Sequence, residues 1–187
     1  MLEALSSLDR NLFLIINSWN AGWLNPIMVF LSGQTLWVPL IGFVIWMAYK
    51  QLDRRSFGIF FLFLLLGIVA SDVTSSYLLK NLVDRLRPCR LPELKALTNQ
   101  FGQKCGGKYG FVSSHAANSM CLMSFAFLVL ELKSWKYYWF WLLPLLVSFS
   151  RIYLGVHYPG DILGGLMVGC LWAYMLAKFF KLRRQTA

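Results

Sequence analysis

Long apolar runs, separated by short polar stretches, set the pattern of this chain. A transmembrane helix needs about 20 consecutive, mostly apolar residues. Five segments approach this length and composition, and we predict spans at residues 26–49, 56–79, 116–132, 138–153 and 161–180. The sequence therefore predicts an all-α fold, a polytopic bundle of transmembrane helices.

Residues 1–22 carry a different pattern. Apolar side chains recur there at helical spacing beside polar ones: Leu5, Leu8, Leu12, Ile15, Ile16 and Trp19 beside Glu3, Asp9, Arg10 and Asn17. This arrangement is typical of an amphipathic helix lying in the membrane interface, although a sixth span is also compatible with it. No basic residue precedes the apolar stretch, which argues against a signal peptide.

Composition supports a membrane protein. Hydrophobic residues make up 58% of the chain and aromatic residues 17%, and the mean hydropathy is +0.56. These values lie outside the usual range of soluble domains. The 187 residues have room for one membrane-embedded domain spanning 1–187, and the polar connection at 88–113 is expected to form an outward loop.

The formal charge of +10 does not indicate a nucleic-acid-binding protein, because the basic residues sit at the ends of the predicted spans. Nine lie on one side: Lys50, Arg54, Arg55, Lys133, Lys136, Lys178, Lys181, Arg183 and Arg184. Eight lie on the other: Lys80, Arg85, Arg87, Arg90, Lys95, Lys104, Lys108 and Arg151. If Lys80, Arg87 and Arg151 hold phosphate, the comparison becomes nine against five, and the positive-inside rule places the first group in the cytoplasm. We expect a multi-pass protein of the inner (plasma) membrane whose site faces the periplasm or outside.

The four cysteines and two histidines lack the spacing of a metal site, so we expect neither a metal nor another cofactor. Cys121 and Cys170 fall inside predicted spans and are expected to pack there. Cys89 and Cys105 share the outward loop, and the sequence leaves open whether they form a disulfide.

Three polar clusters interrupt the apolar pattern. In the first, Lys80 and Arg87 are seven residues apart, a spacing that places both on one face of a helix ended by Pro88. In the second, Ser113 or Ser114 is expected to cap a helix whose free N–H groups bind phosphate oxygens, with His115 close by as an acid.

The third cluster contains Arg151, His157 and Asp161. Gly155 and Pro159 predict a turn between two helices, with Pro159 at the first position of the second helix. His157 would then lie just outside the helix and Asp161 in its first turn, where a carboxylate can orient an imidazole. The imidazole itself is a candidate nucleophile.

Together these clusters resemble the type 2 phosphatidic acid phosphatase family, whose signature reads Lys-x6-Arg-Pro, Pro-Ser-Gly-His and Ser-Arg-x5-His-x3-Asp. Lys80 to Pro88 match the first element, and Ser150 to Asp161 match the third. The second element departs from the signature, because residues 112–115 read Val-Ser-Ser-His. Ser114 brings a Cβ where the family has glycine, which bears on the shape of the loop, and also a hydroxyl donor.

The resemblance implies a role for each residue. His157 would attack phosphorus and form a phosphohistidine, Asp161 would orient it, and His115 would protonate the leaving oxygen and then activate water. The phosphate oxygens would be held by Lys80, Arg87, Ser113, Ser114 and Arg151. Because the two histidines would need opposite protonation states, a bell-shaped pH profile is expected.

Several alternatives stay open. Undecaprenyl diphosphate is the first choice of substrate, with phosphatidylglycerophosphate, phosphatidate and lipid A phosphate as others. A lipid-to-lipid phosphotransferase would use the same residues, and a non-catalytic lipid-phosphate binder or transporter would need only the cations. Lys80 and Arg87 as plain interfacial anchors are a further possibility. The sequence does not indicate the oligomeric state.

Two features lie outside the signature. Asp72 is expected inside the second span, where an ionisable residue often marks a functional site, but a polar contact between helices is the preferred interpretation. Gly160, Gly164, Gly165 and Gly169 have the small-xxx-small spacing of close helix packing.

Overall fold

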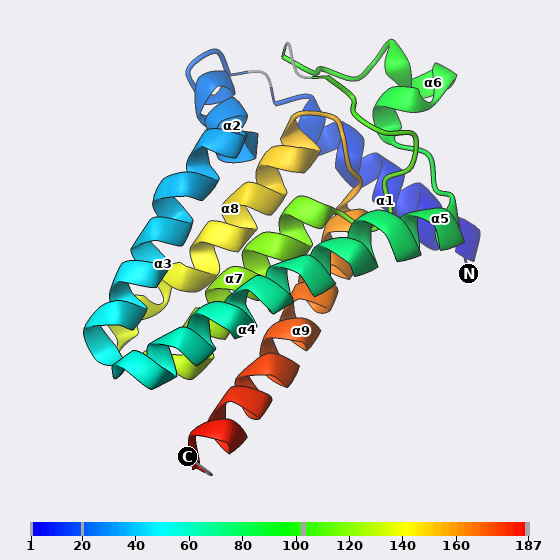
Figure 1. Ribbon diagram of the computed structural model, residues 1–187. Coiled ribbons are helices and arrows are strands. Elements are labelled where there is room, and N and C mark those ends of the chain that lie inside the picture. Colours follow the sequence, from blue (N-terminus) through cyan, green and yellow to red (C-terminus); the bar gives the residue numbers. More distant parts are fainter. Residues whose placement is uncertain (1, 20, 102–103, 186–187) are drawn as a thin grey trace.

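A computed structural model describes residues 2–19, 21–101 and 104–185, and in these ranges it is helical, with no strand. The only strand-like feature described is an isolated bridge between Leu86 and Tyr109. Met1, Asn20, the ends of the chain at 186–187 and residues 102–103 of the predicted outward loop lie outside the described residues. The all-α fold is as predicted (Figure 1).

The helices follow in this order: α1 (Leu2–Asn17), α2 (Leu24–Ser32), α3 (Trp37–Gln51), α4 (Arg54–Asp72), α5 (Lys80–Val83), α6 (Pro92–Lys95), α7 (Ser114–Val129), α8 (Trp139–Tyr153) and α9 (Pro159–Gln185). A π-helical stretch, Val73–Leu79, joins α4 to α5, so that they form one continuous helix of 30 residues. Short 3₁₀ turns lie at Gln34–Leu36, Pro88–Arg90 and Trp135–Tyr137.

Helical segments lie at all five predicted spans, but their lengths differ. Among the described residues, Arg54–Val83 and Pro159–Arg184 are long and apolar enough to cross a membrane alone. The pair formed by α2 and α3 is a third candidate, and α7, with 16 residues, is a shorter apolar helix. The crossing of the membrane by five or six helices therefore stays a prediction.

The prediction of one continuous helix over 26–49 is wrong. The chain bends by 67° between α2 and α3. Gly33 lies at the bend with an extended backbone (φ −79°, ψ 160°), which interrupts the helical hydrogen bonding. As a result, Ser32 and Trp37, on either side of the bend, both reach the candidate site described below.

Helix α7 lies at the centre of the bundle, packed between α4, α8 and α9 (Figure 1). Its side chains are buried around most of its circumference, as expected of a central helix. The contact with α9 is particularly close, because Gly165 faces the Ser113 carbonyl and Gly169 faces Ala117. The predicted small-residue packing of α9 is confirmed.

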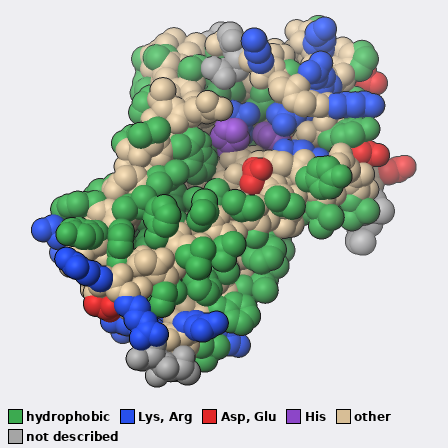
Figure 2. Space-filling model, viewed as in Figure 1, with side chains coloured by type: hydrophobic (Ala, Val, Ile, Leu, Met, Phe, Trp, Pro, Cys, Tyr) green, Lys and Arg blue, Asp and Glu red, His purple; other side chains and the backbone are tan. Residues whose placement is uncertain are grey.

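Large apolar side chains cover the outside of the bundle between two basic ends (Figure 2). On α4, for example, Phe61, Leu65 and Val69 are about half exposed. Such a belt is unfavourable in water and suits the hydrocarbon of a bilayer.

Helix α1 lies across one end of the bundle and contacts α8 and α9 (Figure 1). Its inner face buries Phe13 against the Tyr158 ring and Asn17 against the Tyr153 carbonyl. Its outer face exposes Leu5 and Leu8, as the predicted amphipathic pattern requires. The helical prediction for the N-terminal segment is confirmed, whereas its place in the membrane interface is still a prediction.

Candidate active site

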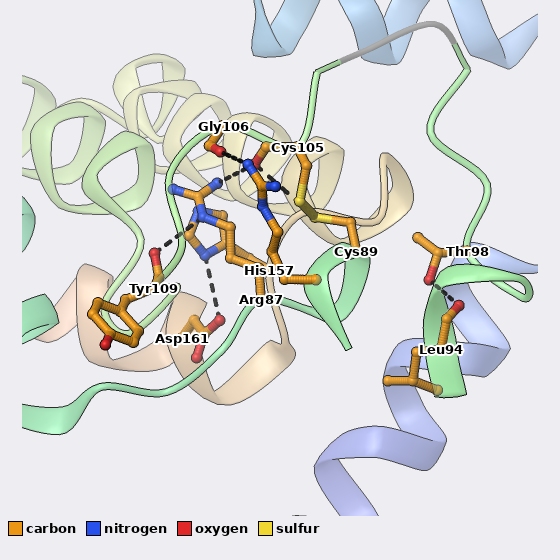
Figure 3. The surroundings of a disulfide bond; sticks show 10 residues. Arg87, Cys89, Leu94, Thr98, Cys105, Gly106, Tyr109, His157 and Asp161 are labelled. Carbon is orange, nitrogen blue, oxygen red and sulfur yellow. Dashed lines mark hydrogen bonds and ion pairs between the residues drawn. A yellow bond between two sulfur atoms is a disulfide. The ribbon is translucent and has the colours of Figure 1, made fainter. Parts of the chain in front are cut away.

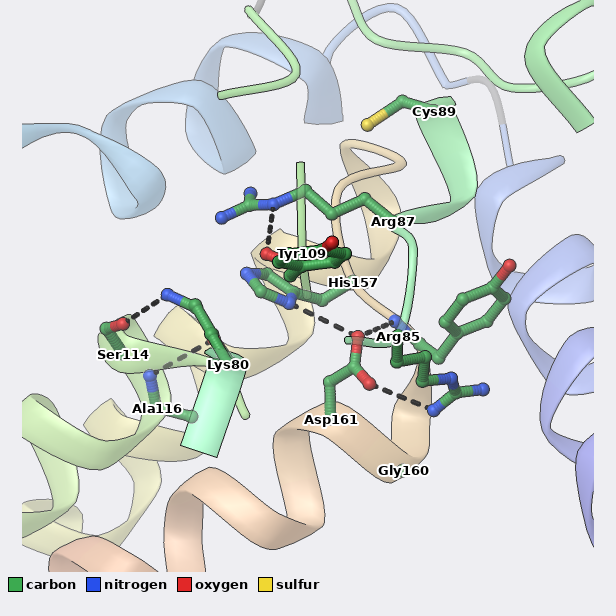
Figure 4. A network of polar contacts seen from close by, with 12 residues as sticks. Lys80, Arg85, Arg87, Cys89, Tyr109, Ser114, Ala116, His157, Gly160 and Asp161 are labelled. Atoms are coloured by element: carbon green, nitrogen blue, oxygen red, sulfur yellow. Dashed lines mark hydrogen bonds and ion pairs between the residues drawn. The ribbon is translucent and has the colours of Figure 1, made fainter. Parts of the chain in front are cut away.

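His157 and Asp161 form a buried pair where the turn after α8 meets α9. The predicted start of α9 at Pro159 is confirmed, so His157 lies just before the helix and Asp161 in its first turn. The His157 Nδ1 lies 3.3 Å from the Asp161 Oδ2. Because this contact occupies Nδ1, the other ring nitrogen is directed away from the carboxylate (Figure 4).

The surroundings of His157 favour its neutral form. Burial lowers the pKa of His157 well below its usual 6.5, and the neighbouring cations Arg87, Arg151 and Lys80 lower it further. A backbone hydrogen bond with Gly110 acts in the opposite direction. A neutral imidazole with one nitrogen held by a carboxylate keeps a lone pair on the other nitrogen, as a nucleophile or base requires.

Arg87 reaches this pair from an extended segment, which differs from the predicted helix. Helix α5 ends at Val83, because Asp84 adopts a left-handed conformation (φ 51°). The residue before a proline is also disfavoured in the helical region, and Arg87 is extended (ψ 152°). Lys80 and Arg87 therefore do not share a helix face, and Pro88 is not the helix stop.

The loop that contains Tyr109 holds Arg87 in place. The Arg87 Nε donates to the Tyr109 carbonyl at 3.0 Å, and its Nη1 donates to the Cys105 carbonyl at 3.1 Å. Cys105 is itself bonded to Cys89, so the disulfide that the sequence left open closes the loop around Arg87 (Figure 3). Burial lowers the pKa of Arg87 from its ordinary value, while the Asp161 carboxylate acts in the opposite direction.

Lys80, at the start of α5, contacts the first residue of α7. Its Nζ donates to the Ser114 Oγ at 2.7 Å, and the same oxygen lies 2.7 Å from the Ser76 Oγ. The Ser114 hydroxyl thus links α7 to the continuous helix that carries Lys80. The serine that departs from the family signature takes part in the cation network of the site (Figure 4).

The bend between α2 and α3 supplies partners for Arg151 and His115. The Arg151 Nη1 donates to the Ser32 Oγ, at the end of α2. The His115 ring meets the Trp37 ring edge-on, with 6.3 Å between centroids.

These side chains line one pocket of about 470 Å³, hollowed where the two histidines are visible in Figure 2. It contains six of the eight residues predicted for the site: Lys80, Arg87, Ser114, His115, Arg151 and His157. Asp161 is fully buried behind His157. Ser113 is also fully buried, and its hydroxyl caps α7 by accepting from the Ala116 N–H. Its predicted contact with phosphate remains a prediction.

The PAP2 superfamily model matches residues 60–185, about two thirds of the chain. The chain belongs to the PAP2 superfamily. The lipid A 4′-phosphatase of Bacteroides thetaiotaomicron is 32% identical over 171 residues, which cover 90% of this chain and 75% of that protein. The undecaprenyl-diphosphatase of Sulfolobus acidocaldarius is 31% identical over 84% of this chain and 71% of its own length.

A solved PAP2 structure shares the fold. The transmembrane PAP2 type phosphatidylglycerolphosphate phosphatase from Bacillus subtilis aligns with a TM-score of 0.75 at 24% identity, covering 95% of this chain and 87% of that one. The helical bundle predicted from the apolar runs is therefore the PAP2 fold, in a family of membrane phosphatases that act on phosphoric esters.

Sequence reasoning placed Arg85 among the outward basic residues and gave it no part in the PAP2 site. The structure pairs its Nη1 with the Asp161 Oδ1 at 2.9 Å and its Nη2 with the Asp9 Oδ2 at 2.6 Å. The guanidinium also stacks on the Tyr158 ring, 4.0 Å from the centroid. Its spacing from Lys80 and Arg87 gave no signal, because its partners come from the two ends of the chain.

Gly110 was likewise missed, and it lies against the buried pair of the PAP2 site. A Cβ at this position would come within 2.8 Å of the Asp161 Oδ2 and 3.6 Å of the His157 Nδ1. Only glycine allows the backbone to approach the carboxylate this closely. No spacing rule identified this position.

Proposed function

We propose that this PAP2 protein hydrolyses the phosphate ester of a lipid through a phosphohistidine on His157. The observation that carries the proposal is the orientation of a neutral, buried His157, with Nδ1 at Asp161 and the other ring nitrogen toward a pocket that also contains Lys80, Arg87 and Arg151. Positioned cations supply most of the catalysis in phosphoryl transfer, because negative charge is spread over the equatorial oxygens.

The reaction would proceed in two balanced steps. In the first, the free nitrogen of His157 forms a bond to phosphorus while the phosphorus–oxygen bond to the lipid breaks, and His115 gives its proton to the leaving alcohol oxygen. In the second, His115 takes a proton from water, whose oxygen attacks phosphorus and breaks the nitrogen–phosphorus bond. Inorganic phosphate leaves, and both histidines return to their starting states. Asp161 holds the Nδ1–H of His157 throughout.

One side chain in the wall of the pocket indicates which kind of substrate is preferred. Of the described side chains that line it, Asp72, on α4, is the only acidic one. Its Oδ1 accepts from Ser76 at 3.1 Å and from Asn118 at 3.0 Å, so it links α4 and α7 as the preferred interpretation predicted. A carboxylate here accepts hydrogen bonds from hydroxyl or amide groups and repels a second phosphate.

We therefore favour a phosphate monoester on a hydroxylated headgroup, the chemistry of the lipid A 4′-phosphate on which the Bacteroides relative acts. Undecaprenyl diphosphate, the first choice from the sequence, is the second candidate because the Sulfolobus relative is named for it. The two candidates differ in the group beside the scissile phosphate, which is a sugar in the first and a phosphate in the second.

Release of inorganic phosphate by the purified protein in detergent, with EDTA present, tests the proposal. Lipid A, undecaprenyl diphosphate, phosphatidylglycerophosphate and phosphatidate are compared at equal mole fractions in the micelle. We expect turnover of lipid A to exceed that of the other three. Binding without release from any of the four would instead support a lipid-phosphate binder, and loss of substrate phosphate to a lipid acceptor rather than water would support a phosphotransferase.

Replacing Asp72 with asparagine is expected to change the preference between substrates. The amide keeps an acceptor for Ser76 and Asn118 but removes the charge that repels a second phosphate. The ratio of kcat/KM for undecaprenyl diphosphate to that for lipid A should rise about tenfold, as one charge contact of about 1.4 kcal/mol would give. Asp53→Asn, at the exposed start of α4, is the control variant. An unchanged ratio would show that the charge of Asp72 does not distinguish the two substrates.

We further propose that the site faces outward from the inner membrane. The nine basic residues assigned to the cytoplasm gather at the end of the bundle away from the histidines (Figures 1 and 2). The Cys89–Cys105 disulfide lies at the opposite end, near the pocket, and disulfides persist in oxidising compartments.

A further inference from the structure

We propose that Arg85 and Asp9 are positioning residues of this site: through them the N-terminal helix α1 holds Asp161, and thereby His157, in the orientation for attack. The proposal rests on the function proposed above only for its effect on turnover. Its geometric basis is a continuous chain of contacts from α1 to the nucleophile.

This series of contacts begins on α1, where the two oxygens of the Asp9 carboxylate have separate partners. One oxygen accepts from the Gly160 N–H, in the first turn of α9, at 2.7 Å. The other accepts from the Arg85 Nη2 at 2.6 Å. A carboxylate is favourable at a helix start, because the first N–H groups have no partner within the helix. Asp9 therefore fixes both the start of α9 and the arginine that follows in the chain of contacts.

Arg85 carries the chain of contacts to Asp161. One nitrogen of its planar guanidinium faces the Asp161 Oδ1 (Figure 4). The other faces Asp9, and the Tyr158 ring lies against the face of the group. The fork geometry of arginine suits two carboxylates at once. Burial raises the pKa of Tyr158 to about 12, which keeps this ring a neutral surface for the cation.

The carboxylate of Asp161 is thus held by partners that lie outside α9. Oδ1 pairs with Arg85, and Oδ2 accepts from the Tyr158 N–H at 3.0 Å and faces the His157 Nδ1. The side chain is fully buried, so water cannot replace a lost partner. Without Arg85, Oδ1 would lose its partner, and the carboxylate could turn about its side-chain bonds and carry the imidazole out of its orientation.

The charges predict opposite effects for the two positions. The groups that act on His157 are Asp161 from α9, Arg151 from α8, Lys80 from α5, His115 from α7 and Arg87 from the loop. Removing the positive charge of Arg85 leaves Asp161 uncompensated, which stabilises the imidazolium and raises the pKa of His157. Removing the negative charge of Asp9 leaves Arg85 uncompensated, which lowers it.

The NMR signals of isotope-labelled histidine rings, followed against pH, report this pKa without any turnover. The chain has two histidines, and the signal that disappears in His115→Gln is that of His115. In detergent, Arg85→Gln should raise the pKa of His157 by about one pH unit relative to wild type. Asp9→Asn should lower it or leave it in place. Arg10→Gln is the control, because Arg10 is on the same helix but pairs with the exposed Glu93. An unchanged pKa in Arg85→Gln, or an equal rise in both variants, would overturn the proposal.

Turnover adds a second measurement. Arg85→Gln should lower kcat about 100-fold with little change in KM, because the nucleophile is misplaced while the phosphate-holding cations stay. Arg85→Lys should restore part of this loss, since an ammonium group can still pair with Asp161. A rise in KM with kcat unchanged would contradict a positioning role, whereas inactivity of the wild type toward every lipid phosphate would count against the proposed function and leave the histidine titration to decide this proposal.

Discussion

Glutamine in place of His157 is expected to abolish phosphate release. Glutamine can approximate the size of imidazole, but its amide nitrogen has no lone pair available to attack phosphorus. The loss should exceed about 10⁴-fold in kcat, in line with the removal of other catalytic nucleophiles. Release of labelled phosphate from a radiolabelled lipid substrate measures it directly, and the thermal unfolding midpoint shows whether the variant is folded.

A phosphohistidine is stable in alkali and labile in acid, so rapid alkaline quenching can capture the intermediate. We expect labelled wild-type protein after such a quench and none in His157→Gln. In His115→Gln, a lipid analogue with an aryl phosphate leaving group needs no acid for the first step. The second step still lacks its base, so label should accumulate on the protein. Equal labelling of His157→Gln and wild type would place the covalent step on another residue.

The second large effect is expected at the contact between α7 and α9. A Cβ on Gly165 would lie 2.5 Å from the Ser113 carbonyl oxygen and 3.0 Å from the Ala116 Cβ. Alanine there must push α7 away from α9, which should lower the free energy of unfolding by about 1–3 kcal/mol. Because the first turn of α7 carries Ser114 and His115, the same shift should lower kcat about 100-fold.

Gly58→Ala on α4 is the matched control, because a Cβ there meets nothing within 4 Å. In this exposed helical position alanine should be neutral or stabilising by up to about 1 kcal/mol. Thermal unfolding and phosphate release are measured for both variants. If Gly165→Ala behaves like Gly58→Ala in both measurements, the close packing of α7 on α9 is not what positions Ser114 and His115.

Local spacing was enough to predict the pair at the centre of the site. His157, Pro159 and Asp161 are within five residues of one another, and Pro159 fixes where α9 begins. The relative positions of the three side chains therefore depend on one turn and one helix start. The same reasoning predicted a helix cap at Ser113 or Ser114, and Ser113 is the cap, with a hydrogen bond that also stays within three residues.

Spacing failed where the backbone departed from a regular helix. Lys80 and Arg87 had the right separation for one helix face, but the left-handed Asp84 ended the helix between them. Aspartate tolerates that conformation better than most residues, yet the sequence around it gave no turn signal strong enough to predict it. The extended Gly33 likewise divided an apolar run that read as one span.

Tertiary contacts account for what the sequence could not indicate. Arg85 lies 76 residues from both Asp9 and Asp161, so no local pattern relates them. Trp37 and Ser32 reach the site only because α2 and α3 meet at an angle. These contacts form only in the folded bundle and leave no local pattern in the sequence.

The contact between Asp9 and Gly160 spans 151 residues and joins the first helix to the last. Because the chain leaves the ribosome N-terminus first, α1 is made long before its partner on α9. During that interval Asp9 lacks the Gly160 N–H, and His157 and Asp161 have not yet been synthesised. Under the proposed function, His157 and Asp161 are held in place only after α9 has formed, and we expect a nascent or C-terminally truncated chain to be inert toward the phosphorylated lipids around it.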